Sequence, residues 1–289
     1  MIATKGEAMM NYKTIVVHLD RDARRAERLE LAFSLAGEFD AHLIGLFALS
    51  AEHIPSAAMA EARAKIIEVQ KRSRAEAARE AETAFRSAIP RHVGSGAEWR
   101  MSEADALGAM CMSARYADLL VAGQRDRHAN SDTGTRPGFL DELVLSTGRP
   151  VLLVPYAGHF PSVGKNVLVA WNAKPEATRA VTDALPLLAR ADSVQVMAFE
   201  PEGSRSGHGE DPGADIALYL ARHGVKATTS RQHCGNDEVG VQILSRAADL
   251  DADLIVMGAY GHSRVRELVL GGVTRTILDS MTVPVLMSH

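Results

Sequence analysis

The chain alternates between two kinds of apolar pattern. Short, nearly continuous apolar runs are typical of strands buried on both faces of a parallel sheet. Between them, apolar residues recur every three or four positions, as over 24–39 and 176–191, and this spacing predicts amphipathic helices. The runs are TIVVHL, HLIGLFAL, DLLVAG and PVLLV, followed by NVLVAW, SVQVMAF, DLIVMG and PVLM. Strands and helices in alternation predict an α/β fold with an open, doubly wound parallel sheet.

The same pattern is written twice. The segment KTIVVHLDRDARRAERLELAF, which begins at Lys13, aligns with KNVLVAWNAKPEATRAVTDAL, which begins at Lys165. ADLLVAG matches ADLIVMG, and LSTGRPVLLVP matches DSMTVPVLMSH. A Gly- and Pro-containing stretch, 156–164, reads as the linker. The repeat predicts two tandem domains, 1–156 and 165–289.

The middle of each unit is less regular. The weaker segments 97–101 and 225–231 fit a fifth strand in each unit. In the first unit, the Ala-, Glu- and Arg-rich stretch 57–89 predicts one long amphipathic helix, either a solvated cover for the sheet or a surface for a protein partner. In the second unit, the polar loop 201–215 and a shorter helix over 216–222 take its place.

Composition narrows the choice of protein class. The chain has 289 residues, of which 46% are hydrophobic and 24% are charged, and its net charge is −4. These values are typical of a soluble globular protein and argue against nucleic acid or an anionic membrane as a partner. No apolar stretch is long enough to span a bilayer. With only two cysteines and no secretory signal pattern at the N-terminus, we expect a cytoplasmic protein with reduced thiols.

Candidate chemistry gathers near the C-terminus, in the stretch GAYGHSRVRELVLGGVTRTIL. Gly258 follows the apolar run 252–257, and Gly271 and Gly272 precede a predicted helix that leads to Leu278. Glycine allows a close approach to the main chain, and the free N–H groups of a helix N-terminus favour an anion. The glycine spacing offers no packing reason that can be seen in the sequence. We therefore interpret this stretch as a cradle for phosphate groups.

This Gly-x2-Gly-x9-Gly spacing, between a strand and a helix and within two tandem βα repeats, resembles the universal stress protein family. The resemblance covers nearly the whole chain. It implies two Rossmann-like domains, each with a parallel five-stranded sheet, and binding of ATP or a related adenine nucleotide, with or without Mg²⁺, by the C-terminal domain. It also implies a role in stress response or signalling. The residues that it assigns to the nucleotide site are Ala170, Asn172, Ala198, Met257, Gly258, Gly261, His262, Arg264, Gly271, Gly272, Val273 and Thr274.

Two positions depart from the family pattern. Gly272 stands where nucleotide-binding members usually carry Ser or Thr, so that Thr274 is the remaining hydroxyl near the loop. Asn172 stands where the first strand of the domain usually ends in Asp, and an amide keeps the hydrogen-bonding capacity without the charge.

The first unit reads differently. It keeps Asp20 and Gly123, but Asp126 stands at the second glycine position and Pro137 takes the place of Gly271. An aspartate repels phosphate, and a proline lacks the N–H group that would bind it. We therefore expect no ATP in this unit. Arg125, Arg127 and Arg136 remain as cations for some other anion or as solvated loop residues.

Patterns of catalytic or metal-binding residues are not evident. The sequence contains no P-loop, no G-x-S-x-G, no H-E-x-x-H and no C-x-x-C, and we assign no catalytic residue and no metal site. A binding protein is therefore the main hypothesis. The alternatives are an ATP-using hydrolase or ligase of similar fold and a ligand-free scaffold that binds a partner through the helix 57–89.

The resemblance also bears on how the two units meet. It implies that they pack on each other through their final strands, PVLLV and PVLM, as an intramolecular pseudo-dimer, with a homodimer of whole chains as a further arrangement. Burying these apolar strands against each other would remove two exposed sheet edges.

Overall fold

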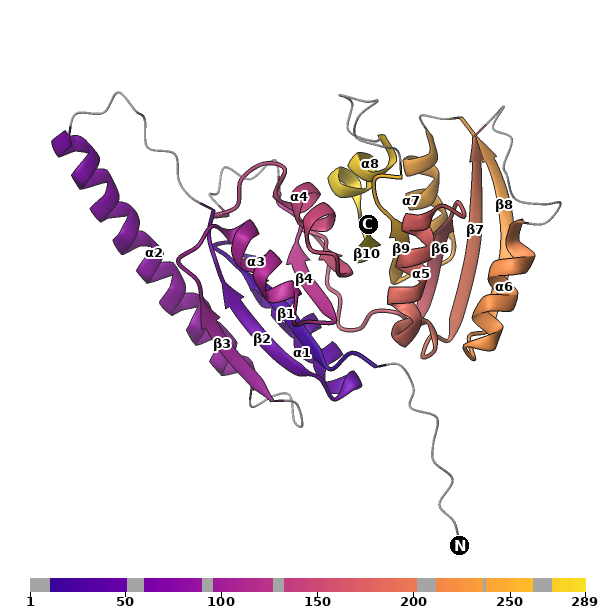
Figure 1. Ribbon diagram of the computed structural model, residues 1–289, viewed down its shortest axis with the longest axis horizontal. Coiled ribbons are helices and arrows are strands. Elements are labelled where there is room, and N and C mark those ends of the chain that lie inside the picture. The colour runs from indigo at the N-terminus through magenta and orange to yellow at the C-terminus, as the bar shows by residue number, and fades with distance from the viewer. Residues whose placement is uncertain are drawn as a thin grey trace, which may run out of the picture.

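The computed structural model describes residues 11–50, 60–89, 96–126, 133–201, 212–235, 238–261 and 272–289. The first unit consists of β1 (Thr14–Leu19), α1 (Arg25–Phe39), β2 (His42–Phe47), α2 (Ala60–Ala88), β3 (Ala97–Met101), α3 (Ala106–Ala114), β4 (Leu119–Gly123), α4 (Phe139–Ser146) and β5 (Val151–Val154). The second unit consists of β6 (Asn166–Trp171), α5 (Pro175–Leu188), β7 (Ser193–Pro201), α6 (Pro212–Arg222), β8 (Ala227–Cys234), α7 (Val239–Asp249), β9 (Leu254–Gly258), α8 (Gly272–Ser280) and β10 (Val285–Ser288) (Figure 1). The predicted alternation of strands and helices is confirmed.

The strands form one ten-stranded sheet in the order β3-β2-β1-β4-β5-β10-β9-β6-β7-β8. Within each unit, neighbouring strands are parallel, and the order reverses direction between β1 and β4 and between β6 and β9. The final strands of the two units pair antiparallel, with Leu286 opposite Leu152. In open α/β sheets, ligands collect beyond the carboxyl ends of the strands at such reversal points.

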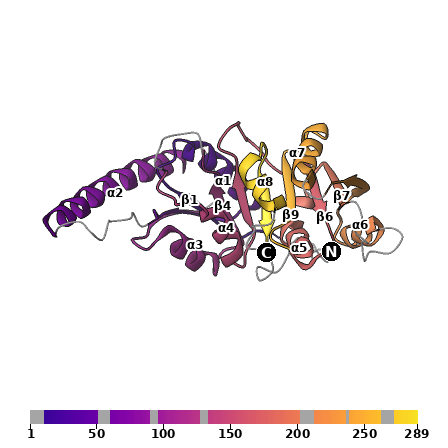
Figure 2. The ribbon, with the colours of Figure 1, turned by 90° about the horizontal axis from the view of Figure 1, so that it is seen from above.

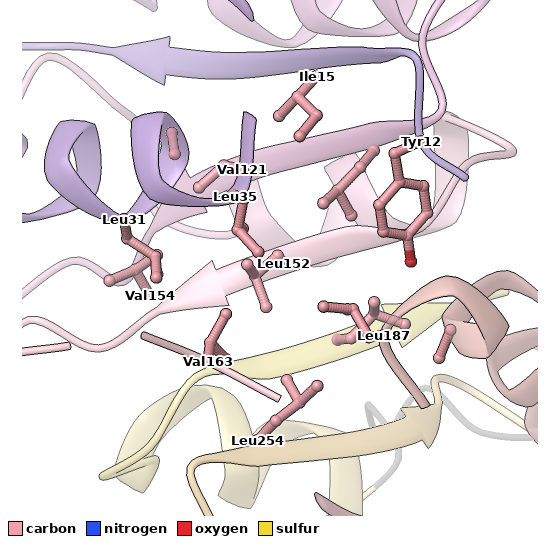
Figure 3. Close-up of a cluster of buried hydrophobic side chains, with 14 of the residues drawn as sticks. Tyr12, Ile15, Leu31, Leu35, Val121, Leu152, Val154, Val163, Leu187 and Leu254 are labelled. Carbon is pink, nitrogen blue, oxygen red and sulfur yellow. The ribbon is translucent and has the colours of Figure 1, made fainter. Parts of the chain in front are cut away.

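Helices cover both faces of the sheet in each unit (Figure 2). One cluster of buried apolar side chains lies under α1, α2, α5 and α6, and a second lies under α3, α4, α7 and α8. The first cluster crosses the boundary between the units, where Leu35 and Leu152 lie close to Val163, Leu187 and Leu254 (Figure 3). The two units therefore share a core.

The long helix of the first unit is confirmed over Ala60–Ala88. Its C-terminal half covers the sheet, where Ala81 and Phe85 are buried and the Phe85 ring lies against Gly45, whose missing Cβ leaves room for it. The N-terminal turns project beyond the sheet (Figure 1), and Val69 is 62% exposed there. Among the described segments, we find no helix with the length and apolar character needed to cross a membrane.

The strands of the second unit differ slightly from the prediction. The fifth strand was expected over 225–231, but β8 extends to Cys234 because it pairs with the long strand β7 as far as Pro201. The helix expected over 216–222 begins earlier, at Pro212. Proline is favoured in the first turn of a helix, where its missing N–H group is not needed.

Candidate functional site

In the second unit, β6 and β9 end side by side, and the N-terminus of α5 lies against the end of β9. A Cβ added to Gly258 would overlap the backbone of Glu176 and Ala177 in the first turn of α5. Gly258 is therefore required by the close packing of the helix on the strand, whether or not a ligand binds. The expectation that this glycine has no packing reason is wrong, because the approach of α5 becomes visible only in three dimensions.

A hydrogen bond joins the described residues at the two ends of the glycine loop, 258–272. Tyr260 has a φ angle of 58°, and its backbone N–H donates to Oγ1 of Thr274 over 3.2 Å. Thr274 is buried in the first turn of α8, so its hydroxyl oxygen joins the start of the loop to the end. His262, Arg264 and Gly271 lie outside the described residues.

The N-terminus of α5 carries no side-chain cap. Lys174 occupies the cap position without a capping hydrogen bond, and Pro175 is the first helical residue. Oδ1 of the exposed Asn172 accepts the N–H of Lys174 over 3.1 Å and so shapes the turn from β6 into the helix. In the first unit, Oδ1 of Asp20 accepts the N–H of Asp22 in the same way. The two aligned residues share this turn-forming role.

Three further predicted residues lie on β6, β7 and β9. Ala170 pairs with Met257 and packs with it against the apolar cluster under α7 and α8. Ala198 pairs with Trp171, which belongs to the cluster on the other face of the sheet. The structure therefore does not bring Ala198 and Met257 onto one face, and a ligand must lie across the end of the sheet to contact both.

The N-terminus of α8 is open. Gly272 begins the helix and is exposed, and a Cβ added there would have no atom within 4 Å. Val273 packs against the cluster under α7 and α8. The described residues thus leave space at the helix N-terminus that the sequence places near the phosphates.

One carboxylate lies beside the glycine loop and works against an anion. Glu176 occupies the first turn of α5, and a Cβ added to Gly261 would lie 3.2 Å from its Oε2. This oxygen is buried and has no hydrogen-bond partner in the part of the chain that the structure describes. A negative charge here stabilises the helix N-terminus but repels phosphate groups.

In the first unit, a buried ion pair lies beside Gly123, the counterpart of Gly258. Arg28 donates to Oδ1 of Asp20 over 2.6 Å, and their side chains are only 2% and 4% exposed. The guanidinium lies against Gly123, where a Cβ would overlap it. The repeat aligns Arg28 with Ala180, so the comparison of the two halves held the signal for this residue, which the sequence analysis did not single out.

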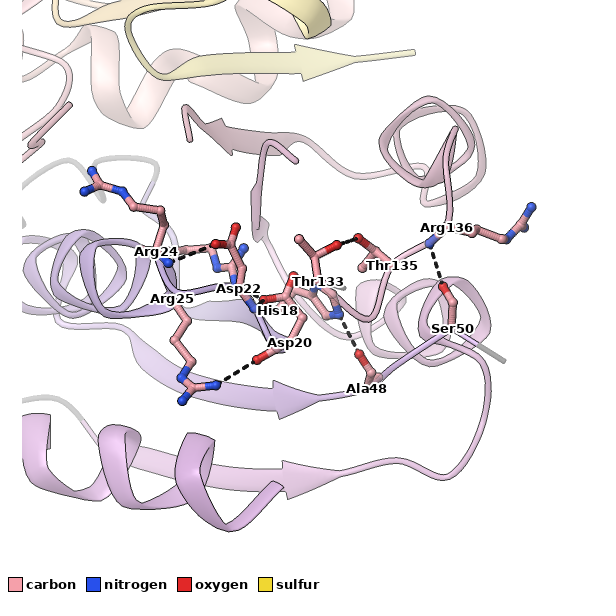
Figure 4. Close-up of polar contacts among 11 residues, drawn as sticks. His18, Asp20, Asp22, Arg24, Arg25, Ala48, Ser50, Thr133, Thr135 and Arg136 are labelled. Atoms are coloured by element: carbon pink, nitrogen blue, oxygen red, sulfur yellow. Dashed lines mark hydrogen bonds and ion pairs between the residues drawn. The ribbon is translucent and has the colours of Figure 1, made fainter. Parts of the chain in front are cut away.

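His18 lies next to this pair. Its Nε2 is 2.9 Å from the carbonyl oxygen of Ala48, and its Nδ1 is 3.8 Å from Oδ2 of Asp20. Burial lowers the pKa of His18, although the Asp20 carboxylate acts in the opposite direction. The ring is therefore neutral near pH 7, and its Nε2–H donates to the carbonyl of Ala48 (Figure 4).

The segment 133–136 closes over the ends of β1 and β2. Thr133 accepts the N–H of Arg21 over 3.0 Å, and Gly134 accepts the N–H of Ser50 over 2.7 Å. The N–H of Arg136 in turn donates to the Ser50 hydroxyl (Figure 4). Together with Arg28, these bonds occupy the ends of β1 and β2 in the first unit.

The remaining candidates of the first unit have partners of their own. Arg125 donates to the carbonyl of Thr135, and Arg136 forms two hydrogen bonds with the Glu142 carboxylate, at 2.9 and 2.7 Å. Pro137 lies between Arg136 and the start of α4. Arg127 lies outside the described residues. Within the described ranges, His, Cys, Asp and Glu side chains form no group of three or more that could hold a metal ion.

Comparisons with known proteins agree with this architecture. Residues 164–289 match the model of the Universal stress protein family. A universal stress protein of Synechocystis sp. is 53% identical over 190 residues, which cover 58% of this chain and 57% of that protein. The chain thus spans little more than half the length of this relative.

Two solved structures resemble the whole chain. A universal stress protein from Archaeoglobus fulgidus DSM 4304 superposes with a TM-score of 0.65 at 16% identity, over 95% of each chain. A putative universal stress protein from Pseudomonas aeruginosa UCBPP-PA14 superposes with a TM-score of 0.60 at 16% identity, over 98% of this chain and 95% of that one. At these identities, the likeness is one of fold, and it extends over both units.

Proposed function

We propose that the chain is a tandem member of the universal stress protein family, whose model residues 164–289 match, and that its second unit binds ATP or a related adenine nucleotide. The nucleotide would lie across the carboxyl ends of β6 and β9, with its phosphates on the glycine loop and its ribose near Asn172. The protein would act as a binding module in stress response or signalling, and nucleotide turnover would not be its function.

The observation that carries this proposal is the contrast between the two units. They share the strand order and the turn after the first strand, yet the first unit seals its strand ends with Arg28 and the segment 133–136. In the second unit, Asn172 is exposed where the aligned Asp20 of the first unit is buried. Because helix N-termini favour anions, the open unit is the one suited to a phosphorylated ligand.

Each part of the nucleotide has its own set of residues in this proposal. The N–H groups of Gly261, Gly272 and Val273 would contact the phosphates, and the sequence motif adds Gly271, with His262 and Arg264 as flanking cations. Met257 and Ala170 would border the base on one face of the sheet, and Ala198 on the other.

The negative charge of Glu176 is unfavourable for phosphate binding at the proposed site. A Mg²⁺ ion bound with the nucleotide would offset its charge, since Mg²⁺ sites commonly combine one or two carboxylates with phosphate oxygens. We therefore propose that the nucleotide enters as its magnesium complex. Binding should then weaken in the presence of EDTA, and less so in a Glu176→Gln variant.

The test of the proposed function uses two opposite substitutions at Gly272. Aspartate there has open space and a favourable place at a helix N-terminus, so the fold should keep its stability. Its carboxylate would repel the phosphates, and we expect ATP affinity to fall about a hundredfold, or roughly 2.8 kcal/mol. Gly272→Ser supplies the hydroxyl that family members usually carry and should raise the affinity by about fivefold, or roughly 1 kcal/mol.

A matched control is available in the first unit. Gly108 is also an exposed glycine in the first turn of a helix, and a Cβ added there has no atom within 4 Å. Gly108→Asp should leave ATP affinity unchanged in isothermal titration calorimetry. If folded Gly272→Asp binds ATP as tightly as the parent, the proposed site is wrong. A stable complex with negligible turnover would separate this function from that of an ATP-using hydrolase or ligase.

A further inference from the structure

The boundary between the units contains a reciprocal pair of hydrogen bonds. Each unit extends a side chain from just after its fourth strand onto the last helix of the other unit. Gln124, which follows β4, donates from Nε2 to the carbonyl of Leu278 on α8 over 2.8 Å. Tyr260, which follows β9, donates from its hydroxyl to Oδ1 of Asp141 on α4 over 2.5 Å.

The hydrogen bond from Tyr260 belongs to a strong class, because its acceptor is a carboxylate. Asp141 lies in the first turn of α4, where the positive end of the helix favours a carboxylate. A hydrogen bond to an ionised acceptor is about twice as strong as one between neutral groups. Oδ1 of Asp141 therefore holds the ring of Tyr260 from the side of the first unit.

The hydrogen bond to Asp141 matters because Tyr260 has an unfavourable backbone conformation. Its φ angle of 58° is left-handed, which costs a bulky residue about 1–2 kcal/mol. The backbone N–H is bonded to Thr274 and the side chain to Asp141, so both contacts favour the strained form. The next residue is Gly261, the second glycine of the proposed phosphate loop.

Close packing alone does not fix the ring at this place. A cavity of about 290 Å³ is lined mainly by residues of the first unit, Asp141 among them, and is completed by Leu278 and Asp279 of the second unit. Asp141, which accepts the hydrogen bond from the Tyr260 hydroxyl, is one of these lining residues, so packed side chains do not enclose this end of the bond. Removing the bond should therefore release the start of the glycine loop.

We infer that the first unit positions the phosphate loop of the second through the Asp141–Tyr260 hydrogen bond. The inference rests on the proposed function and deepens it: Tyr260 is a positioning residue, and the phosphate affinity of one unit depends on a carboxylate of the other. A first unit that is itself closed to nucleotide thus still takes part in nucleotide binding.

The experiment compares Tyr260→Phe, Asp141→Ala and the double variant in calorimetric titrations with ATP and with adenosine. Because the loop holds phosphates, each single variant should weaken ATP binding about five- to tenfold and leave adenosine binding unchanged. The double variant should bind ATP no more weakly than either single variant. Asp141→Asn, which keeps an acceptor oxygen, should recover part of the affinity.

Tyr12→Phe is the matched control. The Tyr12 hydroxyl also crosses the boundary, where it donates to the carbonyl of Asp183 over 2.7 Å, but that bond lies in the shared core away from the loop. This variant should leave the ratio of ATP to adenosine affinity unchanged. Equal losses for ATP and adenosine, or no loss in Tyr260→Phe, would overturn the inference.

A second measurement separates this inference from the proposed function. Amide hydrogen exchange of 258–261 in the ligand-free protein should accelerate in Tyr260→Phe and Asp141→Ala but not in Tyr12→Phe. If the parent binds no nucleotide, the proposed function fails, while faster exchange still supports the link between the units. Unchanged exchange in both variants overturns the link, whatever the parent binds.

Discussion

The buried ion pair of the first unit gives the sharpest stability prediction. Asp20→Asn keeps the shape of the side chain and the acceptor oxygen for the N–H of Asp22, but it removes the charge that faces Arg28. Since the guanidinium is only 2% exposed and its Nε already has no partner, it would stay buried without a counter-ion. Removing one partner of a buried pair costs about 3–5 kcal/mol. We expect a loss of about 3 kcal/mol, near the lower end, because the amide still accepts a hydrogen bond.

The double variant Asp20→Asn/Arg28→Met tests the reasoning. It removes both charges and keeps most of the volume, and such replacements are often neutral or stabilising. Its free energy of unfolding should therefore lie within about 1 kcal/mol of the parent. The assay is urea unfolding followed by Trp99 in a Trp171→Phe background, because each unit contains one of the two tryptophans.

An exposed pair of similar geometry serves as the control for Asp20→Asn. Glu142 binds Arg136 through two short hydrogen bonds, but their side chains are 36% and 44% exposed. Glu142→Gln should cost less than about 1 kcal/mol. The reasoning is refuted if Asp20→Asn costs no more than this control, or if the double variant is less stable than Asp20→Asn alone.

Two further predictions concern ligand number and pH. Because the first unit is sealed, calorimetry should give one adenine nucleotide per chain, and two equivalent sites would contradict our account of Arg28 and the segment 133–136. Because burial lowers the pKa of His18, the unfolded chain binds a proton near pH 6.5 that the folded chain does not bind. The stability of the folded chain is therefore highest above this pH and decreases below it. Between pH 7.5 and 5.5, urea unfolding should show a loss of at most about 1.4 kcal/mol that His18→Gln abolishes, and an unchanged slope in that variant would count against the assignment.

The sequence predicted the architecture well because the repeat and the apolar runs are local signals. The strand over 97–101 has the predicted bounds, whereas β8 runs on to Cys234 because the length of a strand also depends on its neighbour, here β7. The candidate site was harder to predict. The importance of Gly258 for packing depends on how α5 meets β9, and no spacing in the sequence records that contact.

Arg28 shows a second reason why the site could not be predicted in full. A charged residue within an amphipathic helix is usually solvated, so the pattern alone favours an exposed position. Its burial follows from the carboxylate of Asp20, which is eight residues away and comes from the strand before the helix. Only the alignment of the two halves, which places Ala180 opposite Arg28, marks the position as unusual.

The two units therefore illustrate two physical solutions for the same end of the same sheet. In the first, a buried ion pair and backbone hydrogen bonds occupy the strand ends. In the second, Tyr260 is held in a left-handed conformation, and a buried oxygen of Glu176 has no hydrogen-bond partner among the described residues. Each of these features costs stability in the free protein, and each lies where the proposed nucleotide would bind. The left-handed conformation of Tyr260, which no described non-glycine residue adopts at the matching end of the first unit, favours a site built for an external ligand over a loop that has merely lost its packing.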